Sequence, residues 1–600
     1  MISRYVAVLC LLCGGLGQAA EFPQFRSLPA GDGQSVALLH GGKILLRWRG
    51  AGGSEAVARA ATTLNELAFA GLSPQDLIAA AEAVPARADA KSPATPAPAV
   101  VRARDRVVLR IDHAQAKLSS SMPLGLATMW AQSIAQVFEK PYVVARGTSL
   151  QVPAGESRRA EYGGRTDGLP QAFVLDEAVA VAAVEPVGRG ITVTGRAPGT
   201  STVCVRVGEI EALIPVVVRK WAARVPASIP LLVSGRAQDN PWLERAARLA
   251  AQTAVEPEPG ASATVRDIKV GADGGSVKIA ASGLEYFTLE RTVPFRVQKV
   301  GYPAGDPVRS ILSNDPERVE VAQPLFRFPM VAQETIHFLW HHLGGASRAL
   351  NVLVRISNSG DSPATVHVTG ADGGPSPDEV YVGHVVMQRF QIAGRGQTGL
   401  ALRVPPRKSV VLSCLPMPTG RVVSGFARLQ LMEGEAVFLE TEAAERIVEP
   451  GAVSDISPSM NPDTPTRFLQ LPGYKALQLR HEVGRGWGFL HIGKTPEDAV
   501  LHPRLKGDYG VVHDVAVTYD NPNGYGARLE LALRSGGGPA RAIVEVNGEL
   551  LETGLLGLGD EHVLFRQRVT GTRTPPVRVR IIPQSGSNYP MTLTARSVAD

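Results

Sequence analysis

The stretches that decide the fold are YVVARGTSLQVPAG at 142–155, DEAVAVAAVEPVGRGITVTGRAPGTSTVCVRV at 176–207 and ALIPVVVRK at 212–220. Short runs rich in Val, Ile and Thr alternate there with Gly and Pro turn signals, which is the pattern of two packed antiparallel sheets. The glycines at 195 and 199 would allow a tight reversal that joins two of these strands directly. We therefore expect a small β-sandwich over residues 142–220.

The composition is that of a globular protein with several domains. The chain has 600 residues, a length that predicts roughly four domains. Hydrophobic residues make up 44% and charged residues 20%, which excludes a disordered chain, and 62 glycines with 45 prolines favour turn-rich β structure. We expect a mainly β, multidomain fold with Ig-like and jelly-roll-like β-sandwiches and a small amino-terminal α+β domain.

The formal net charge of +6 is small for this length. An ordinary mixed surface is the simpler interpretation, although the sign of the charge also fits a weak preference for anionic envelope polymers. No basic run alternates with aromatic residues, so no nucleic-acid partner is expected. The partners that remain are envelope proteins or polysaccharide.

The amino terminus has the pattern of a Sec-type signal peptide. Arg4 precedes an apolar run at 5–12, and Gly-Gln-Ala-Ala follows at 17–20. Small residues at the end of this segment predict cleavage after Ala19 or one residue later, and the run is too short to span a bilayer. We expect residues 1–20 to be removed and the protein to be exported, to the periplasm or outside the cell, with no integral membrane segment after cleavage.

The four cysteines give little sign of a disulfide framework. Cys10 and Cys13 fall within the expected signal peptide, and a lipid anchor there is disfavoured because a Leu precedes each of them. Cys204 and Cys414 lie in apolar, strand-like runs of different segments, so we expect buried thiols rather than a disulfide. Beyond the expected signal peptide, the sequence contains no Cys-x-x-Cys pair and no zinc-binding spacing.

Shifts in composition and in turn signals divide the chain into segments. The expected organisation is a signal peptide at 1–20, an α+β domain at 34–140 interrupted by a Pro/Ala linker at 84–99, an Ig-like sandwich at 142–220, a helical connector at 238–254, a β-sandwich region at 262–445 and a carboxyl-terminal β-sandwich at 466–598.

Three longer helices are expected between the strands, together with a short one that Ser73 would cap and Pro74 would begin. Ser54 would cap the first, which Gly71 would end, and the apolar residues of 123–138 repeat at helical spacing. The third helix, over 239–253, would be capped by Asn240.

Turn chemistry predicts three hairpins in the second half of the chain. The runs LNVLVRISN at 350–358 and ATVHVTG at 364–370 would pair directly. Asn523-Gly524 and Asn547-Gly548 are strong signals for two-residue hairpin turns.

The segment 142–218 resembles bacterial Ig-like domains, in particular the amino-terminal domain of pilus-assembly, secretin-type proteins. The matching residues are Arg146-Gly147-Thr148-Ser149, the strand pair around 176–180, and the run 191–205. The resemblance implies a pilus or secretion role, but no long secretin gate region follows, so spacer or adhesive use of the fold fits at least as well. The remainder resembles uncharacterised exported bacterial multidomain proteins.

Four aromatic residues of the last segment are the candidates for ligand binding. Trp487, Tyr509, Tyr519 and Tyr525 would form a platform for carbohydrate if they shared one exposed face. The aromatic share of the chain is only 6%, and Trp487 stands beside glycines in a strand-like run, so a core role is favoured for them.

A metal site at His337, His341 and His342 is not expected. A His pair four residues apart binds a metal when it lies on a helix. The run ETIHFLWHHLGG at 334–345 has the pattern of a strand, in which such positions are about 13 Å apart. We expect these histidines in a paired strand or core, and the sequence indicates no metal or other cofactor.

No catalytic motif is present, because the nucleophile-elbow, zinc-protease and phosphate-loop patterns are all missing from the sequence. Asp315 and Glu317 would make a carboxylate pair, but a turn or capping role is favoured. The expected function is that of an exported, non-catalytic binding or structural module. The alternatives are a polysaccharide-binding or polysaccharide-processing accessory protein and a pilus or secretion component. A deep pocket where Asp, Glu or His side chains converge would argue for catalysis.

Overall fold

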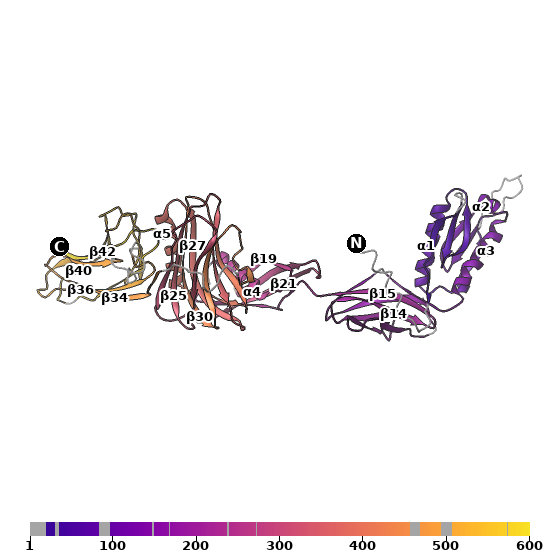
Figure 1. Ribbon diagram of the computed structural model, residues 1–600, viewed down its shortest axis with the longest axis horizontal. Helices are drawn as coiled ribbons and strands as arrows, with labels where there is room; N and C mark the ends of the chain where they lie inside the picture. Colours follow the sequence, from indigo (N-terminus) through magenta and orange to yellow (C-terminus); the bar gives the residue numbers. More distant parts are fainter. Residues whose placement is uncertain are drawn as a thin grey trace. The chain divides into compact units, whose positions relative to one another are not determined.

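The computed structural model shows a mainly β, multidomain protein (Figure 1). The chain divides into two compact units. Unit 1 comprises Met1–Ala222 and Gly283–Phe287, and unit 2 comprises Ala223–Ser282 and Thr288–Asp600. The residues that the structure describes are 20–30, 35–82, 97–146, 149–166, 168–236, 239–271, 273–456, 469–493, 507–572 and 574–599. The expected signal peptide with Cys10 and Cys13, and most of the expected Pro/Ala linker, lie outside them.

The first part of unit 1 packs helices on two small sheets. The sheets contain β2 (Arg26–Pro29), β3 (Ser35–His40) and β4 (Lys43–Arg49), and β5 (Leu77–Ala81), β6 (Ala99–Ala103) and β7 (Arg106–Ile111). The helices are α1 (Gly53–Phe69), α2 (His113–Leu118) and α3 (Pro123–Ala135). The apolar stripe of α3 is buried as expected, with Trp130 against Trp48 at 5.9 Å between ring centroids. Ser54 does not cap α1, because Gly52 is at the cap position.

The second part of unit 1 is an Ig-like sandwich. One sheet has the order β1-β15-β14-β11 with β9 beside β15, and the other has the order β12-β13-β10-β8. The strands are β1 (Ala20–Glu21), β8 (Tyr142–Ala145), β9 (Leu150–Pro153), β10 (Ser157–Arg165), β11 (Gln171–Val174), β12 (Ala180–Val184), β13 (Gly190–Gly195), β14 (Gly199–Val207) and β15 (Ile210–Arg219). The expected direct pairing across 195–199 is wrong, because β13 and β14 lie in opposite sheets. Their apolar residues Ile191 and Val203 belong to one shared core between the sheets.

The expectation of two buried thiols is confirmed for Cys204 and is wrong for Cys414. Cys204 is buried on β14 and Cys414 is half-buried, and neither forms a disulfide among the described residues.

Unit 2 begins with a large sandwich, which we call the middle sandwich. Its first sheet has the order β19-β20-β21-β17-β28-β27-β30-β25-β22-β33, with β23 beside β25, and its second has the order β24-β31-β26-β29-β32. The strands of the first sheet are β17 (Ile229–Ser234), β19 (Ser262–Gly271), β20 (Gly274–Ser282), β21 (Leu289–Lys299), β22 (Arg309–Ser313), β23 (Arg318–Val319), β25 (Thr335–Gly344), β27 (Ala364–Ser376), β28 (Gly399–Val404), β30 (Val422–Glu433) and β33 (Leu469–Pro472). The second sheet contains β24 (Gln323–Pro329), β26 (Leu350–Asn358), β29 (Lys408–Met417), β31 (Val437–Ala444) and β32 (Val453–Asp455). A short ribbon of β16 (Ala223–Arg224) and β18 (Glu256–Pro257) completes the strands that precede the last sandwich.

Two helices accompany the middle sandwich. The expected helix α4 (Asn240–Ala254) packs on β17, β19 and β28, and its cap is Asp239 rather than Asn240, because the Asp239 carboxylate accepts a hydrogen bond from the Trp242 backbone N–H. Helix α5 (Glu379–Arg395) was not expected. It packs on β27 and β30 through buried residues at helical spacing, among them Val382, Val386 and Phe390.

The expected pairing of 350–358 with 364–370 is wrong. Strand β26 pairs with β29 and β31, whereas β27 pairs with β28 and β30, so the loop between them crosses from one sheet to the other. Every residue of β26 is buried, because neighbours cover both its faces and both its edges.

The carboxyl-terminal sandwich packs two further sheets, of order β34-β36-β41-β38-β39 and β35-β42-β37-β40. The strands are β34 (Tyr474–Glu482), β35 (Gly488–Ile492), β36 (Val512–Asp520), β37 (Ala527–Ser535), β38 (Ile543–Val546), β39 (Glu549–Glu552), β40 (Glu561–Val569), β41 (Val577–Ile581) and β42 (Met591–Ala599). The turn at Asn547-Gly548 is confirmed, since it joins β38 to β39 and both residues have positive φ. The expected hairpin at Asn523-Gly524 is wrong, because that loop joins strands of different sheets.

Candidate functional site

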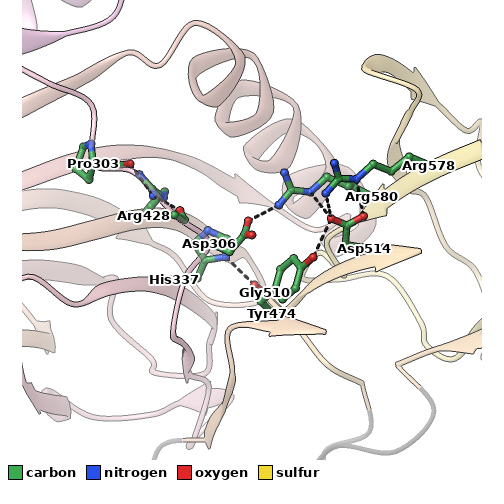
Figure 2. Close-up of polar contacts among 10 residues, drawn as sticks. Pro303, Asp306, His337, Arg428, Tyr474, Gly510, Asp514, Arg578 and Arg580 are labelled. Atoms are coloured by element: carbon green, nitrogen blue, oxygen red, sulfur yellow. Dashed lines mark hydrogen bonds and ion pairs between the residues drawn. The ribbon is translucent and has the colours of Figure 1, made fainter. Parts of the chain in front are cut away.

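The middle and carboxyl-terminal sandwiches meet at a junction within unit 2 that polar contacts hold together (Figure 2). Nδ1 of His337, on β25, lies 2.8 Å from the carbonyl oxygen of Gly510 in the carboxyl-terminal sandwich. The Arg580 guanidinium on β41 donates a hydrogen bond to the Asp306 carboxylate, which precedes β22. Each contact joins residues more than 170 positions apart in the sequence.

Asp514 on β36 is the centre of the polar network on the carboxyl-terminal side of this junction (Figure 2). Arg578 donates from both Nε and Nη2 to its carboxylate, and the Tyr474 hydroxyl donates across 2.9 Å. The hydrogen bonds from Arg578 are the largest cause of the lowered pKa of Asp514. The carboxylate is therefore charged at neutral pH and fully paired.

A cavity of about 170 Å³ lies at the same junction. Asn314 and Glu317 line it from the segment after β22, His341 lines it from β25, and Glu379 lines it from the first turn of α5. The carboxyl-terminal sandwich closes the cavity with Tyr509 and the segment 585–588. Residues from four separate parts of the chain therefore face one small space.

Three ionisable groups converge in this cavity, which we call the junction cluster: Glu317, His341 and Glu379. Their nitrogen and oxygen atoms lie within 4.8 Å of one another. His341 is only 6% exposed, and its Nδ1 is buried without a hydrogen-bond partner among the described residues. Oδ1 of Asn314 is also buried and has no hydrogen-bond partner among the described residues.

The electrostatics of the junction cluster are those of an uncompensated negative site. Burial raises the pKa of Glu379, and the nearby carboxylates of Glu317 and Asp378 raise it further. Burial also raises the pKa of Tyr509 to about 12, with the two cluster glutamates as the next causes. Burial lowers the pKa of His341 to about 4, so its imidazole is neutral at pH 7.

The histidines of 334–345 lie on a strand, as expected. His337 and His341 are on one face of β25, and His342 is on the other, where its Nδ1 lies 3.0 Å from the Pro316 carbonyl oxygen. The sequence argued against a metal site made by two histidines of this strand. It gave no sign that His341 alone lies close to carboxylates from other elements. The sequence reasoning considered Asp315 as the carboxylate beside Glu317 and favoured a turn or capping role, whereas the second carboxylate in the cavity is Glu379.

The four candidate aromatic residues do not form one platform. Tyr519 is buried in the core of the carboxyl-terminal sandwich, and Tyr509 lines the junction cavity, so neither ring is available on an outer face. Trp487 and Tyr525 are 55% and 54% exposed, and for these two the favoured core role is wrong. A Cβ placed on Gly484 would lie 3.7 Å from the Tyr525 ring, which puts this ring beside the turn that leads to Trp487.

An exposed aromatic pair that the sequence reasoning missed stands at the edge strand β35. Phe489 is 56% exposed, and its ring centroid is 6.1 Å from that of Trp487. The Arg596 guanidinium lies 5.1 Å from the Trp487 ring centroid and forms ion pairs with Glu530 and Glu561. The sequence held a partial signal, because Trp487 directly precedes β35 and stands two residues before Phe489.

A larger cavity of about 580 Å³ is found in unit 1, between the α+β part and the Ig-like sandwich. Its lining includes two ionisable residues of opposite charge, Glu21 and Arg26, and is otherwise uncharged. It therefore lacks the convergence of acidic and imidazole groups that marks the junction cavity.

Comparisons with known proteins identify no family. No family model and no curated protein matches the chain. Solved structures match parts of it. Domains 4 and 5 of the S-layer protein SbsC are 16% identical over 20% of this chain and 65% of that chain, with a TM-score of 0.12. Fibronectin(III)-like modules of Clostridium thermocellum CbhA are 10% identical over 26% of this chain and 94% of that chain (TM-score 0.13), and tandem Ig repeats of Dlar are 10% identical over 27% of this chain and 98% of that chain (TM-score 0.12). These scores are too low for anything about ligand or activity to be taken from them.

Among the described helices, none combines the length and the apolar character needed to cross a bilayer.

Proposed function

We propose that this chain is an exported, non-catalytic β-sandwich protein that binds a polysaccharide of the cell envelope or exterior through Trp487 and Phe489. The observation that carries the proposal is the exposure of these two neighbouring rings at the start of the edge strand β35. Two large aromatic side chains left in water cost free energy that burial would recover, and such patches mark binding sites.

The surroundings of the pair suit a carbohydrate polymer. The flat rings offer apolar faces to the C–H groups of a sugar, while the partly exposed Arg596 and its ion-pair partner Glu561 offer a hydrogen-bond donor and an acceptor to its hydroxyls. The site lies on an exposed surface, so a long polysaccharide can bind across it without passing through an enclosed channel.

A non-catalytic role is consistent with the dimensions of the junction cavity. Its volume of about 170 Å³ is below the roughly 300–1,000 Å³ of small-molecule sites. The convergence of glutamate and histidine there has room for an ion and water rather than for a sugar substrate.

Glycan-array binding by the full chain tests the proposal. We expect binding to a subset of polysaccharides, and Trp487→Ala or Phe489→Ala should weaken it at least about tenfold, or ~1.4 kcal/mol. Tyr381→Ala is the matched control, because Tyr381 is 53% exposed on α5, away from this face, and its removal should leave binding unchanged. Absence of binding to every glycan, or wild-type binding by Trp487→Ala, would overturn the proposal.

Export is supported by the signal-peptide pattern of residues 1–20. Fusion of a reporter enzyme that is active only outside the cytoplasm should give activity with the full chain and none after deletion of 5–12. Amino-terminal sequencing of the exported protein should begin at Ala20 or Glu21.

The alternative role is that of a pilus or secretion component. It is supported by the Ig-like sandwich of β8–β15, which lies in the segment that resembles the pilus-assembly domain. It predicts that deletion of this chain removes surface appendages while glycan binding by the purified protein is absent.

A further inference from the structure

Within the described residues, the carboxylates of Glu317 and Glu379 have no cationic partner, unlike two other carboxylates at the junction. Asp514 is paired with Arg578, and Asp508 is paired with Lys475 at 3.0 Å. No ion pair to Glu317 or Glu379 is found within the described parts of the chain, although the two groups lie close together. Two carboxylates that share one site repel each other unless a positive charge lies between them.

We propose that Glu317, His341 and Glu379 bind a divalent transition-metal ion, with Oδ1 of Asn314 as a further ligand or as a partner of a metal-bound water. The buried Nδ1 of His341 and Oδ1 of Asn314, both without a partner, point independently to a missing ligand, because unpaired buried polar atoms are costly. The cavity leaves room for several water molecules beside the ion.

The donor set selects the class of metal. Two carboxylates and one neutral imidazole match Zn²⁺, Mn²⁺ or Fe²⁺, which accept mixed nitrogen and oxygen ligands. Calcium and magnesium prefer all-oxygen shells, so the imidazole disfavours them.

The ion would fasten three elements that the sequence keeps apart. Glu379 is the first residue of α5, His341 lies within β25, and Glu317 follows β22. A Cβ placed on Gly586 would lie 2.1 Å from the Glu379 carbonyl oxygen, so the segment 585–588 packs directly on the first turn of α5. Metal binding would therefore stabilise α5 and, through it, the junction of the two sandwiches. This role is independent of polysaccharide binding.

Metal titration of the tag-free full chain, after treatment with EDTA, tests the proposal. Calorimetry with Zn²⁺ should show one saturable site that the double variant Glu317→Gln/Glu379→Gln weakens at least about 100-fold. Co²⁺ should give visible absorption bands in the wild type and not in the double variant. Zn²⁺ at about 100 times Kd should raise the Tm of the wild type by about 5 °C.

The matched control is Glu320→Gln, since Glu320 is an exposed glutamate near the cluster that forms an ion pair with Arg318 outside the cavity. It should bind Zn²⁺ like the wild type. Both cluster glutamates are exposed, so the double variant should fold, and in EDTA it should be at least as stable as the wild type because the repulsion is gone. Absence of saturable binding, or equal binding by wild type and double variant, would overturn the proposal.

Discussion

At the scale of single residues, burial makes the junction sensitive to acid. His337 is buried between the rings of Phe390 and Phe426, and burial lowers its pKa to about 3, although the hydrogen bond to Gly510 acts in the opposite direction. The unfolded chain takes up this proton near pH 6.5, well before the folded protein does. The stabilisation is therefore complete above about pH 6.5 and is lost as the pH falls below it.

His337→Gln should remove this acid sensitivity. Between about pH 7.5 and about pH 5.5 the wild type should lose ~1.4 kcal/mol more of its free energy of unfolding than the variant, which has no ring to titrate. Urea unfolding measures the free energy of unfolding of each protein at the two pH values. The value of each protein at about pH 7.5 is the reference for its own change on acidification. Parallel pH dependence in the two proteins would contradict the effect of burial on His337.

At the scale of elements, α5 joins the cores of the two sandwiches. Phe390 packs edge-on against Phe426 at 4.5 Å and belongs to a core cluster that includes residues of both sandwiches. Phe390→Ala should lower the free energy of unfolding by about 3–5 kcal/mol. Ile392→Ala on the exposed face of the same helix should change it by no more than about 0.5 kcal/mol. Thermal unfolding compares the two, and equal effects would show that α5 does not contribute to this core.

The same helix shows which elements sequence reasoning can find. The stripe of α3 was predicted because Leu126, Trp130 and Ile134 repeat at helical spacing without a run of β-branched residues. In α5, Val380, Val382 and Val386 give a strand-like composition, and the helical spacing of its buried face becomes clear only once β27 and β30 lie beneath it. The predicted strand pairings were wrong for a related reason. Local turn signals do not show whether a loop joins neighbouring strands of one sheet or crosses to the other sheet.

The candidate sites show the same contrast between local sequence signals and long-range packing. Trp487 was named from the sequence as one of four candidate aromatic residues with a core role favoured, and its exposed neighbour Phe489 was not considered. The junction cluster was not predicted, since Glu317, His341 and Glu379 come from three elements and meet only through long-range packing. A lone glutamate and a strand histidine carry no spacing signal of the kind that a helical metal motif provides.

At the scale of the whole molecule, each of the two compact units has its own core, so each should unfold with its own transition. Leu64 is fully buried in the core of unit 1, and Leu64→Ala removes side-chain volume there at a cost of about 2–5 kcal/mol. Differential scanning calorimetry of the full chain should show that Leu64→Ala lowers one transition and Phe390→Ala lowers the other. Leu124→Ala, at an exposed position of α3, should shift neither. Zn²⁺ should raise only the transition that Phe390→Ala lowers, because the junction cluster lies within unit 2. A single transition that both core substitutions shift alike would mean that the two units unfold as one.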